Sequence, residues 1–172
     1  MAKRSSHGSP PNQPKNPTTA AFSSPIPHVA ELGIELLEAS GGRGLMRLPW
    51  QAQLVGNPET GVLHGGVVTT LIDSVCGIAC LTALEAPQPI ATLDLRIDYI
   101  RPATPKLDLF ATAEAYKVTR QVVFLRATAY QGDPDDLVAA AVSTFMLTGR
   151  LGPRVPKART TKDAASVTGG QP

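Results

Sequence analysis

The chain has 172 residues, of which 42% are hydrophobic and 17% charged, and its formal net charge at pH 7 is +2. This length suits one domain with tails. Residues 28–151 contain nine Lys and Arg against thirteen Asp and Glu, so the positive charge belongs to the two ends. Basic tails around an acidic centre give no reason to expect a nucleic-acid partner.

The composition predicts a cytoplasmic protein without a membrane span. Residues 1–20 are basic but have no apolar run behind them, which argues against a secretory signal. We find no apolar stretch of about 18 residues in the sequence, so no membrane span is expected. Cys76 and Cys80 share one face of a predicted helix, where thiols pack as small hydrophobic groups and a disulfide is disfavoured. Since only three histidines accompany them, we expect no metal or redox cofactor.

The first elements lie between a tail and a glycine pair. Residues 1–27 hold six prolines and are predicted to be disordered, as is the basic stretch 151–172, which leaves 28–150 as the domain. Apolar residues at mixed helical spacing predict a short helix over residues 28–39. Loose alternation over residues 43–50 then predicts a first strand, with Met46 and Leu48 on one side.

The central stretch is a turn followed by one long helix. Asn-Pro and Thr-Gly pairs mark a turn over residues 57–61, and the helix is predicted from about Gly65 to Ala83, before Pro87. This helix is apolar nearly all round, which is typical of a buried helix. Asp73 lies in its middle. Because an unpaired buried charge costs several kcal/mol, Asp73 is either paired in the core or functional.

Four further strands are predicted after the helix, over residues 91–100, 107–118, 121–130 and 137–147. In the first of them, strict alternation sets Leu93, Leu95, Ile97 and Tyr99 on one face and Thr92, Asp94, Arg96 and Asp98 on the other. Short connections indicate antiparallel pairing, so the fold class is α+β, with a five-stranded antiparallel sheet and one helix. One sheet covers only part of an apolar helix, and a second copy of the chain would cover the rest.

Several motifs together resemble a known family. They are Asn57, Gly61, the run His64-Gly65-Gly66 at the helix start, Asp73, the strand ATLDLRIDYIRPA and the terminal strand ending FMLTGR. This set resembles the hot-dog-fold acyl-CoA thioesterases, in the PaaI-like branch of the 4-hydroxybenzoyl-CoA thioesterase superfamily, over about Val29 to Gly149. The resemblance implies a sheet wrapped around one central helix. It also implies a dimer whose sheets join edge to edge and whose active sites lie between the subunits.

The resemblance also implies residue roles. The backbone N–H of Gly65 would polarise the thioester carbonyl, and Asp73 of the other chain would act as general base or nucleophile. Asn57 would position water or substrate, and Thr92 would lie beside the acid. Asn57 lies seven residues before His64, whereas the family's commoner loop has six. Gly77 stands where enzymes with a glutamate at the acid position carry a threonine, which favours the aspartate type.

General chemistry supports an oxyanion site at Gly65 and Gly66. A helix start offers free N–H groups and about +0.5 of an elementary charge, and glycine lets a substrate approach the backbone. The alternative is that the two glycines only permit a tight turn. His64 would either orient the loop or take part in acid–base chemistry. Arg101 and Arg120 would either bind the phosphates of coenzyme A or be solvated turn charges.

The functional hypothesis is hydrolysis of an acyl-CoA to a free acid and coenzyme A by a homo-oligomer, a dimer or a dimer of dimers. The rival is a protein of the same fold that binds acyl thioesters without turning them over. A hydratase is a weaker third hypothesis, because it would need an Asp/His pair placed differently. The acyl group and the choice between coenzyme A and a carrier protein stay open.

Overall fold

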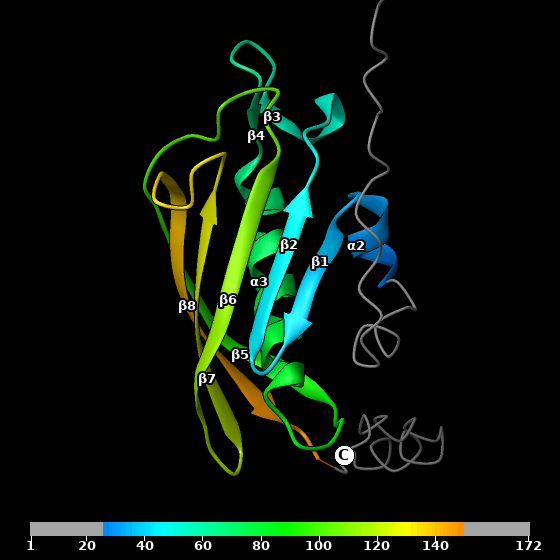
Figure 1. The fold of residues 1–172 in the computed structure, drawn as a ribbon. Coiled ribbons are helices and arrows are strands. Elements are labelled where there is room, and N and C mark those ends of the chain that lie inside the picture. The colour runs from blue at the N-terminus through cyan, green and yellow to red at the C-terminus, as the bar shows by residue number, and fades with distance from the viewer. Residues whose placement is uncertain (1–25, 150–172) are drawn as a thin grey trace, which may run out of the picture.

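The structure is a computed structural model that describes residues 26–149 (Figure 1). The predicted tails therefore lie outside the described residues, apart from Ile26 and Pro27. The first described helix, α2, is Pro27–Glu31 and begins with a proline, whose fixed φ suits the first turn of a helix.

Six antiparallel strands form the main sheet, in the order β1-β2-β6-β7-β8-β5 (Figure 1). The bounds are Glu35–Ser40 for β1, Arg43–Leu48 for β2, Ile90–Tyr99 for β5, Leu109–Val118 for β6, Val122–Tyr130 for β7 and Leu137–Leu147 for β8. A 3-10 turn, Ala52–Leu54, precedes a small two-stranded sheet of β3 (Val55–Asn57) and β4 (Val62–Leu63). The predicted antiparallel α+β fold is confirmed, with one strand more than the five expected.

The additional strand, β1, corrects the predicted helix over residues 28–39. That helix ends at Glu31, and Gly33 follows with a φ of +69°, a conformation that glycine adopts readily and that ends the helix. The register of β1 against β2 shifts between Leu36 and Glu38, so Leu37 is an extra residue. This bulge breaks the period of two, which is why the apolar spacing looked helical.

The long helix α3, Gly65–Thr82, lies against one face of the sheet (Figure 1). Its fully buried side chains include Leu71, Ile72 and Val75. On the sheet side, a Cβ on Gly44 of β2 would lie 3.2 Å from the carbonyl oxygen of Val75, so glycine permits this close contact. With a mean hydropathy of 1.6, α3 meets the length and composition of a membrane span, contrary to the sequence expectation. Its burial among the strands explains that composition as that of a core helix.

A bulge also corrects the predicted faces of β5. The register of β5 against β8 shifts between Thr92 and Asp94, so Leu93 is the extra residue. Leu93 is 52% exposed instead of facing the core. Because a bulge reverses the alternation on one side of it, Thr92 points toward α3, on the same face as Leu95 and Ile97.

Candidate active site

The first turn of α3 presents a backbone donor. His64 is the N-cap residue, and its Nδ1 accepts a hydrogen bond of 3.0 Å from the N–H of Gly66. The N–H of Gly65, one residue earlier in the chain, has no acceptor among the described residues. Both glycines are exposed. One N–H at the positive end of an 18-residue helix is thus available to a ligand.

The carbonyl of the same glycine is held from β5. The Tyr99 hydroxyl donates to the Gly65 oxygen at 2.9 Å, and the Thr69 hydroxyl donates to it at 3.1 Å. The two hydroxyl oxygens are 2.9 Å apart. Tyr99 was not among the predicted site residues. The signal was present, because alternation set Tyr99 on the face toward the helix, where a phenolic hydroxyl needs a partner.

The loop before α3 is held by a close backbone contact. The His64 N–H donates to the Leu54 carbonyl at 2.9 Å. A Cβ on Gly56 in β3 would lie 2.8 Å from the Cα of His64, a distance that real side chains do not adopt. Gly56 therefore lets β3 lie directly against His64. Sequence reasoning missed this glycine, and no local pattern marks it.

Asp73 lies in the middle of α3 on its less covered face. Its Oδ1 accepts a hydrogen bond of 3.0 Å from the Thr92 hydroxyl. Asp73 is half-buried, and the ion pairs of the described residues do not include it. Gly66, Thr70 and Gly77 follow the same helical stripe, and none of them is buried. The carboxylate is thus oriented by one hydroxyl and borders the part of α3 that the sheet leaves open.

Gly65 and Asp73 of one chain are too far apart to act on the same carbonyl group. They are eight residues apart in one helix. At about 1.5 Å of rise per residue this separation is about 12 Å along the axis. If both act in one reaction, as predicted, each needs a partner group from another chain. We call the predicted donor at Gly65 the donor half-site and the predicted acid at Asp73 the acid half-site.

Asn57 accepts hydrogen bonds within the turn between β3 and β4. Its side-chain Oδ1 accepts from the Glu59 N–H at 3.0 Å, and its carbonyl accepts from the N–H groups of Thr60 and Gly61. This arrangement is an Asx turn. The predicted role of Asn57 in positioning water or substrate stays a prediction.

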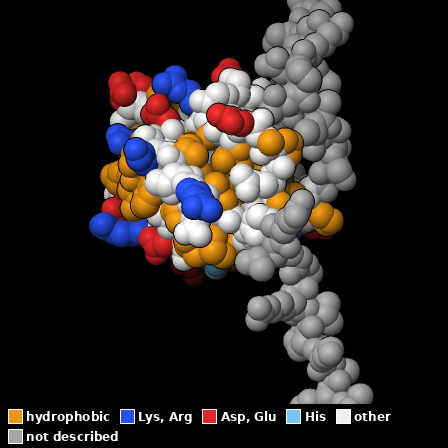
Figure 2. Space-filling view, turned by 90° about the horizontal axis from the view of Figure 1, so that it is seen from below, with side chains coloured by type: hydrophobic (Ala, Val, Ile, Leu, Met, Phe, Trp, Pro, Cys, Tyr) orange, Lys and Arg blue, Asp and Glu red, His pale blue; other side chains and the backbone are white. Residues whose placement is uncertain are grey.

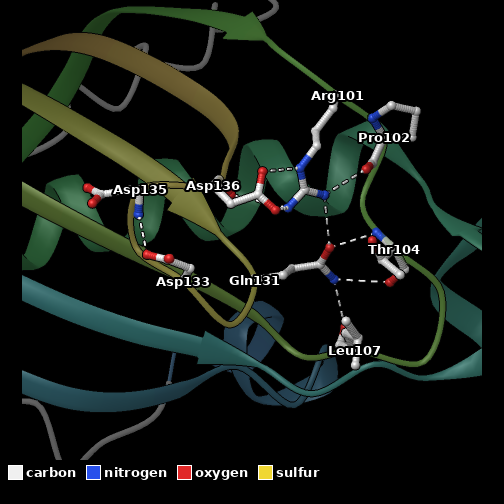
Figure 3. Close-up of polar contacts among 8 residues, drawn as sticks. All are labelled: Arg101, Pro102, Thr104, Leu107, Gln131, Asp133, Asp135 and Asp136. Carbon is white, nitrogen blue, oxygen red and sulfur yellow. Dashed lines mark hydrogen bonds and ion pairs between the residues drawn. The ribbon is translucent and has the colours of Figure 1, made fainter.

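Arg101 is held in a network of loop contacts (Figure 3). Its Nε and one terminal nitrogen donate to the two carboxylate oxygens of Asp136, at 2.9 and 2.7 Å. The other donors reach the carbonyls of Pro102 and Asp136 and the side-chain oxygen of Gln131. All five N–H groups of the guanidinium are therefore engaged within the chain. A coenzyme A phosphate would have to displace these contacts, so the predicted phosphate role of Arg101 stays a prediction.

Arg120 lies in the turn between β6 and β7, away from Gly65. The N–H of Ala115 near the end of β6 donates to Gly42, whose own N–H donates to Thr82 at the end of α3. The β6–β7 turn is thus at the C-terminal end of α3, opposite to the donor half-site (Figure 1). Within one chain, Arg120 and Gly65 do not meet.

The two cysteines are packing residues with unreactive thiols. Both are buried in α3 and neither forms a disulfide. Burial raises the pKa of Cys76 to about 12, with a further contribution from the charge of Asp73, and it raises the pKa of Cys80 to about 11. Both thiols are therefore protonated at neutral pH. Within residues 26–149 no three His, Cys, Asp or Glu side chains are grouped to hold a metal ion.

An apolar cleft of about 360 Å³ opens beside the donor half-site. Gly65 and Tyr99 border it, together with Val62, Leu63, Val68, Ile100, Arg101, Pro102, Ala103 and Val138. A larger open hollow of about 820 Å³ lies over β2, β6 and β7 and is bordered by the Arg43–Glu114 ion pair and Arg126. None of the predicted site residues borders that hollow. The smaller cleft is therefore the one that geometry associates with Gly65.

Known proteins match this chain in sequence. The family model of the thioesterase superfamily matches residues 60–138, which include both half-sites. A provisionally named esterase of Halobacterium salinarum is 39% identical over 90 residues, which span 51% of this chain and 58% of that protein. The medium/long-chain acyl-CoA thioesterase YigI of Salmonella typhimurium is 27% identical over 135 residues, which span 71% of this chain and 86% of YigI.

Solved structures match it in fold. A protein of Pseudomonas aeruginosa superposes with a TM-score of 0.67 and 43% identity, covering 75% of this chain and 96% of that chain. A variant of the phenylacetic acid degradation protein PaaI of Thermus thermophilus superposes with a TM-score of 0.62 and 25% identity, covering 70% and 97%. The fold and the sequence thus point to the same group of proteins.

Proposed function

This chain belongs to the thioesterase superfamily and has its hot-dog fold, and we propose that it hydrolyses an acyl-CoA to a free acid and coenzyme A. The observation that carries the proposal is the pair of half-sites on α3, a helix-start N–H at Gly65 and a carboxylate at Asp73. In the reaction, water adds its oxygen to the acyl carbon and the carbon–sulfur bond breaks. The sulfur leaves as the thiol of coenzyme A after taking up a proton.

The Gly65 N–H supplies the electrophilic half of the reaction. As water attacks, negative charge builds on the carbonyl oxygen of the thioester. A preformed N–H at a helix start stabilises that charge without reorganising, an effect commonly worth about 3–4 kcal/mol per donor. Since the Gly66 N–H is already bound to His64, Gly65 supplies the donor that a substrate can use.

Asp73 supplies the nucleophilic half. As a general base it takes a proton from the attacking water, and as a nucleophile it forms an anhydride that water then hydrolyses. Its Oδ1 is bound to the Thr92 hydroxyl, so Oδ2 is the oxygen directed to the reaction. The His64 imidazole caps the helix through Nδ1, which fits an orienting role for His64.

The two half-sites meet when two copies of the chain associate. The strand β5 is an edge of the sheet and is ten residues long, and such an edge is normally paired or covered. Figure 2 views the end of the molecule at which α3 finishes and shows hydrophobic side chains gathered across it. Leu93, the bulged residue of β5, is an exposed hydrophobic residue on this edge strand. A two-fold axis across α3 and β5 would bring Gly65 of one chain to Asp73 of its partner.

The chemistry of the cleft favours an apolar acyl group. The cleft beside Gly65 is bordered mainly by aliphatic side chains such as Leu63, Val68 and Val138. An acyl group whose carbonyl oxygen accepts from Gly65 can extend along these side chains. Acyl-CoA as the substrate class is supported by the similarity to YigI, which is named as a medium/long-chain acyl-CoA thioesterase.

The test is release of free thiol from a panel of acyl-CoAs. We expect the wild type to hydrolyse at least one of them, and Asp73→Asn to lower its kcat by about 100-fold or more, equivalent to about 2.7 kcal/mol. Gly65→Pro removes the backbone N–H and adds a side-chain ring that fixes φ. It suits the first position of the helix, because His64 already has the extended ψ of 133° that precedes proline. Gly65→Ala keeps the N–H and is the matched control.

Two outcomes would contradict the proposal. Background rates for the wild type over the whole panel would leave a non-catalytic acyl-thioester binding protein as the better account, and acyl-CoA affinity would then be measured. Turnover that survives in both Asp73→Asn and Gly65→Pro would place the chemistry elsewhere in the molecule.

A further inference from the structure

The peptide group between Gly65 and Gly66 is held at both of its edges. Its carbonyl oxygen accepts from the Tyr99 hydroxyl at 2.9 Å. Its N–H donates to His64 Nδ1 at 3.0 Å. Because a peptide group is planar, these two contacts together fix its orientation. We call this pair of contacts the peptide clamp.

The clamp matters because this part of the helix has little intrinsic rigidity. Gly65 and Gly66 are consecutive, both exposed, and glycine carries the largest conformational freedom of all residues. Neither glycine has a side chain that could restrict rotation about its backbone bonds. The Gly65 N–H belongs to the peptide group between His64 and Gly65, whose carbonyl accepts from the Val67 N–H at 3.0 Å. Its remaining freedom is rotation about the backbone bonds of Gly65, which the adjoining Gly65–Gly66 peptide group restricts.

Tyr99 contributes to the peptide clamp from a position that is fixed by strand pairing. It is the last residue of β5 and is paired with Ala139 of β8. Its hydroxyl lies 3.5 Å from the position that a Cβ on Gly65 would take, so it lies directly over the glycine. The Thr69 hydroxyl, 2.9 Å away, donates to the same carbonyl oxygen at 3.1 Å, so both side chains hold the Gly65 carbonyl.

We propose that Tyr99 is a positioning residue that aims the Gly65 N–H at the thioester oxygen, through its hydrogen bond to the Gly65 carbonyl. The proposal rests on the function proposed above and adds a residue from β5 to the donor half-site. Tyr99 acts through the backbone and takes no part in proton transfer.

The test is Tyr99→Phe, which keeps the ring and removes the hydroxyl. Tyr116→Phe is the matched control, because Tyr116 is 50% exposed against 52% for Tyr99 and its hydroxyl has no hydrogen-bond partner among the described residues. We expect Tyr99→Phe to lower kcat by about 10-fold with KM within about twofold, since a donor used in the transition state affects kcat. The melting temperature should stay within about 2 °C.

A second readout does not depend on turnover. Exchange of the Gly66 amide with solvent deuterium should be about 10-fold faster in Tyr99→Phe, and unchanged in Tyr116→Phe, because the clamped peptide opens more often. A kcat within twofold of the wild type, or an equal fall in Tyr116→Phe, would overturn the proposal. An unchanged Gly66 exchange rate would overturn it even if no acyl-CoA is hydrolysed, which separates its failure from failure of the proposed function.

Discussion

Thr92 reaches Asp73 because one residue, Leu93, is bulged out of β5. Without the bulge, Thr92 would point to the opposite face of the sheet, and the carboxylate would lose its one hydrogen bond within the described residues. Bulges are frequent next to active sites, where they redirect a side chain. The bulge therefore turns the Thr92 hydroxyl toward Asp73 in the acid half-site.

Removing the Thr92 hydroxyl should impair turnover more than folding. Thr92→Val has a similar shape and suits a strand, so stability should be close to that of the wild type. We expect kcat for the best acyl-CoA to fall by about 10-fold, since a hydrogen bond to a carboxylate orients it. Thr92→Ser keeps the hydroxyl and should retain activity within about threefold. Full activity of Thr92→Val would show that this hydrogen bond does not orient the carboxylate.

The cysteines predict how stability changes with alkaline pH. In the folded chain the pKa of Cys76 is about 12 and that of Cys80 about 11, whereas an ordinary thiol has 9.0. Above pH 9 the unfolded chain therefore releases protons that the folded chain keeps. The free energy of unfolding should fall as the pH rises from 9 toward 12. Denaturant titrations of the wild type and of Cys76→Ala/Cys80→Ala would show this as a shallower decline in the variant. Parallel declines would contradict the assignment.

Residue roles were predictable from sequence only in part. The Asp73 and Gly65 positions follow from an aspartate and a glycine pair in one apolar helix. The contact of Thr92 with Asp73 was implied by family resemblance and was contradicted by strict alternation, since a bulge leaves no mark in residue type. Alternation places Tyr99 on the face toward the helix but does not show which group it contacts, and no local pattern marks Gly56.

Among the elements, the loop after β5 is held by one buried amide. Gln131 is 5% exposed and follows β7. Its amide nitrogen donates to the carbonyls of Thr104 and Leu107, and its oxygen accepts from the Thr104 N–H at 2.6 Å (Figure 3). The same oxygen accepts from Arg101. Gln131 thereby fixes the loop whose first residues border the cleft beside Gly65.

Replacing Gln131 with leucine should destabilise the fold. The substitution leaves the backbone groups of Thr104 and the carbonyl of Leu107 without their partners on the buried Gln131 side chain. We expect the free energy of unfolding to fall by about 2–4 kcal/mol in denaturant titrations. Gln121→Leu, at an exposed position in the β6–β7 turn, should change it by less than about 0.5 kcal/mol. Equal effects of the two substitutions would mean that the amide contacts add little.

Long and regular elements were predictable, and irregular ones were not. The predicted ranges of α3, β7 and β8 agree with the structure to within one residue. The segment that forms α2 and β1 was predicted as one helix. Gly33 interrupts the helical period of about 3.6 residues, and the bulge at Leu37 interrupts the strand period of two, within a few residues of each other. Period alone does not distinguish a bulged strand from a short helix.

For the whole molecule, the fold follows from the order of elements and short connections, while the site does not follow from one chain. A helix apolar nearly all round already suggested a second copy. The structure adds that the donor and acid half-sites of one chain lie about 12 Å apart along α3. A dimer with two-fold symmetry would therefore contain two equivalent sites, each built from both chains.

Subunit mixing would test this composite site most directly. A heterodimer of Asp73→Asn and Gly65→Pro chains, purified through two different tags, would contain one site with both defects and one with neither. If the sites are shared between chains, thiol release per heterodimer should be about half that of the wild-type dimer, although each parent dimer is inactive. If each chain carried its own complete site, every site would hold one defect, and the heterodimer would be as inactive as its parents.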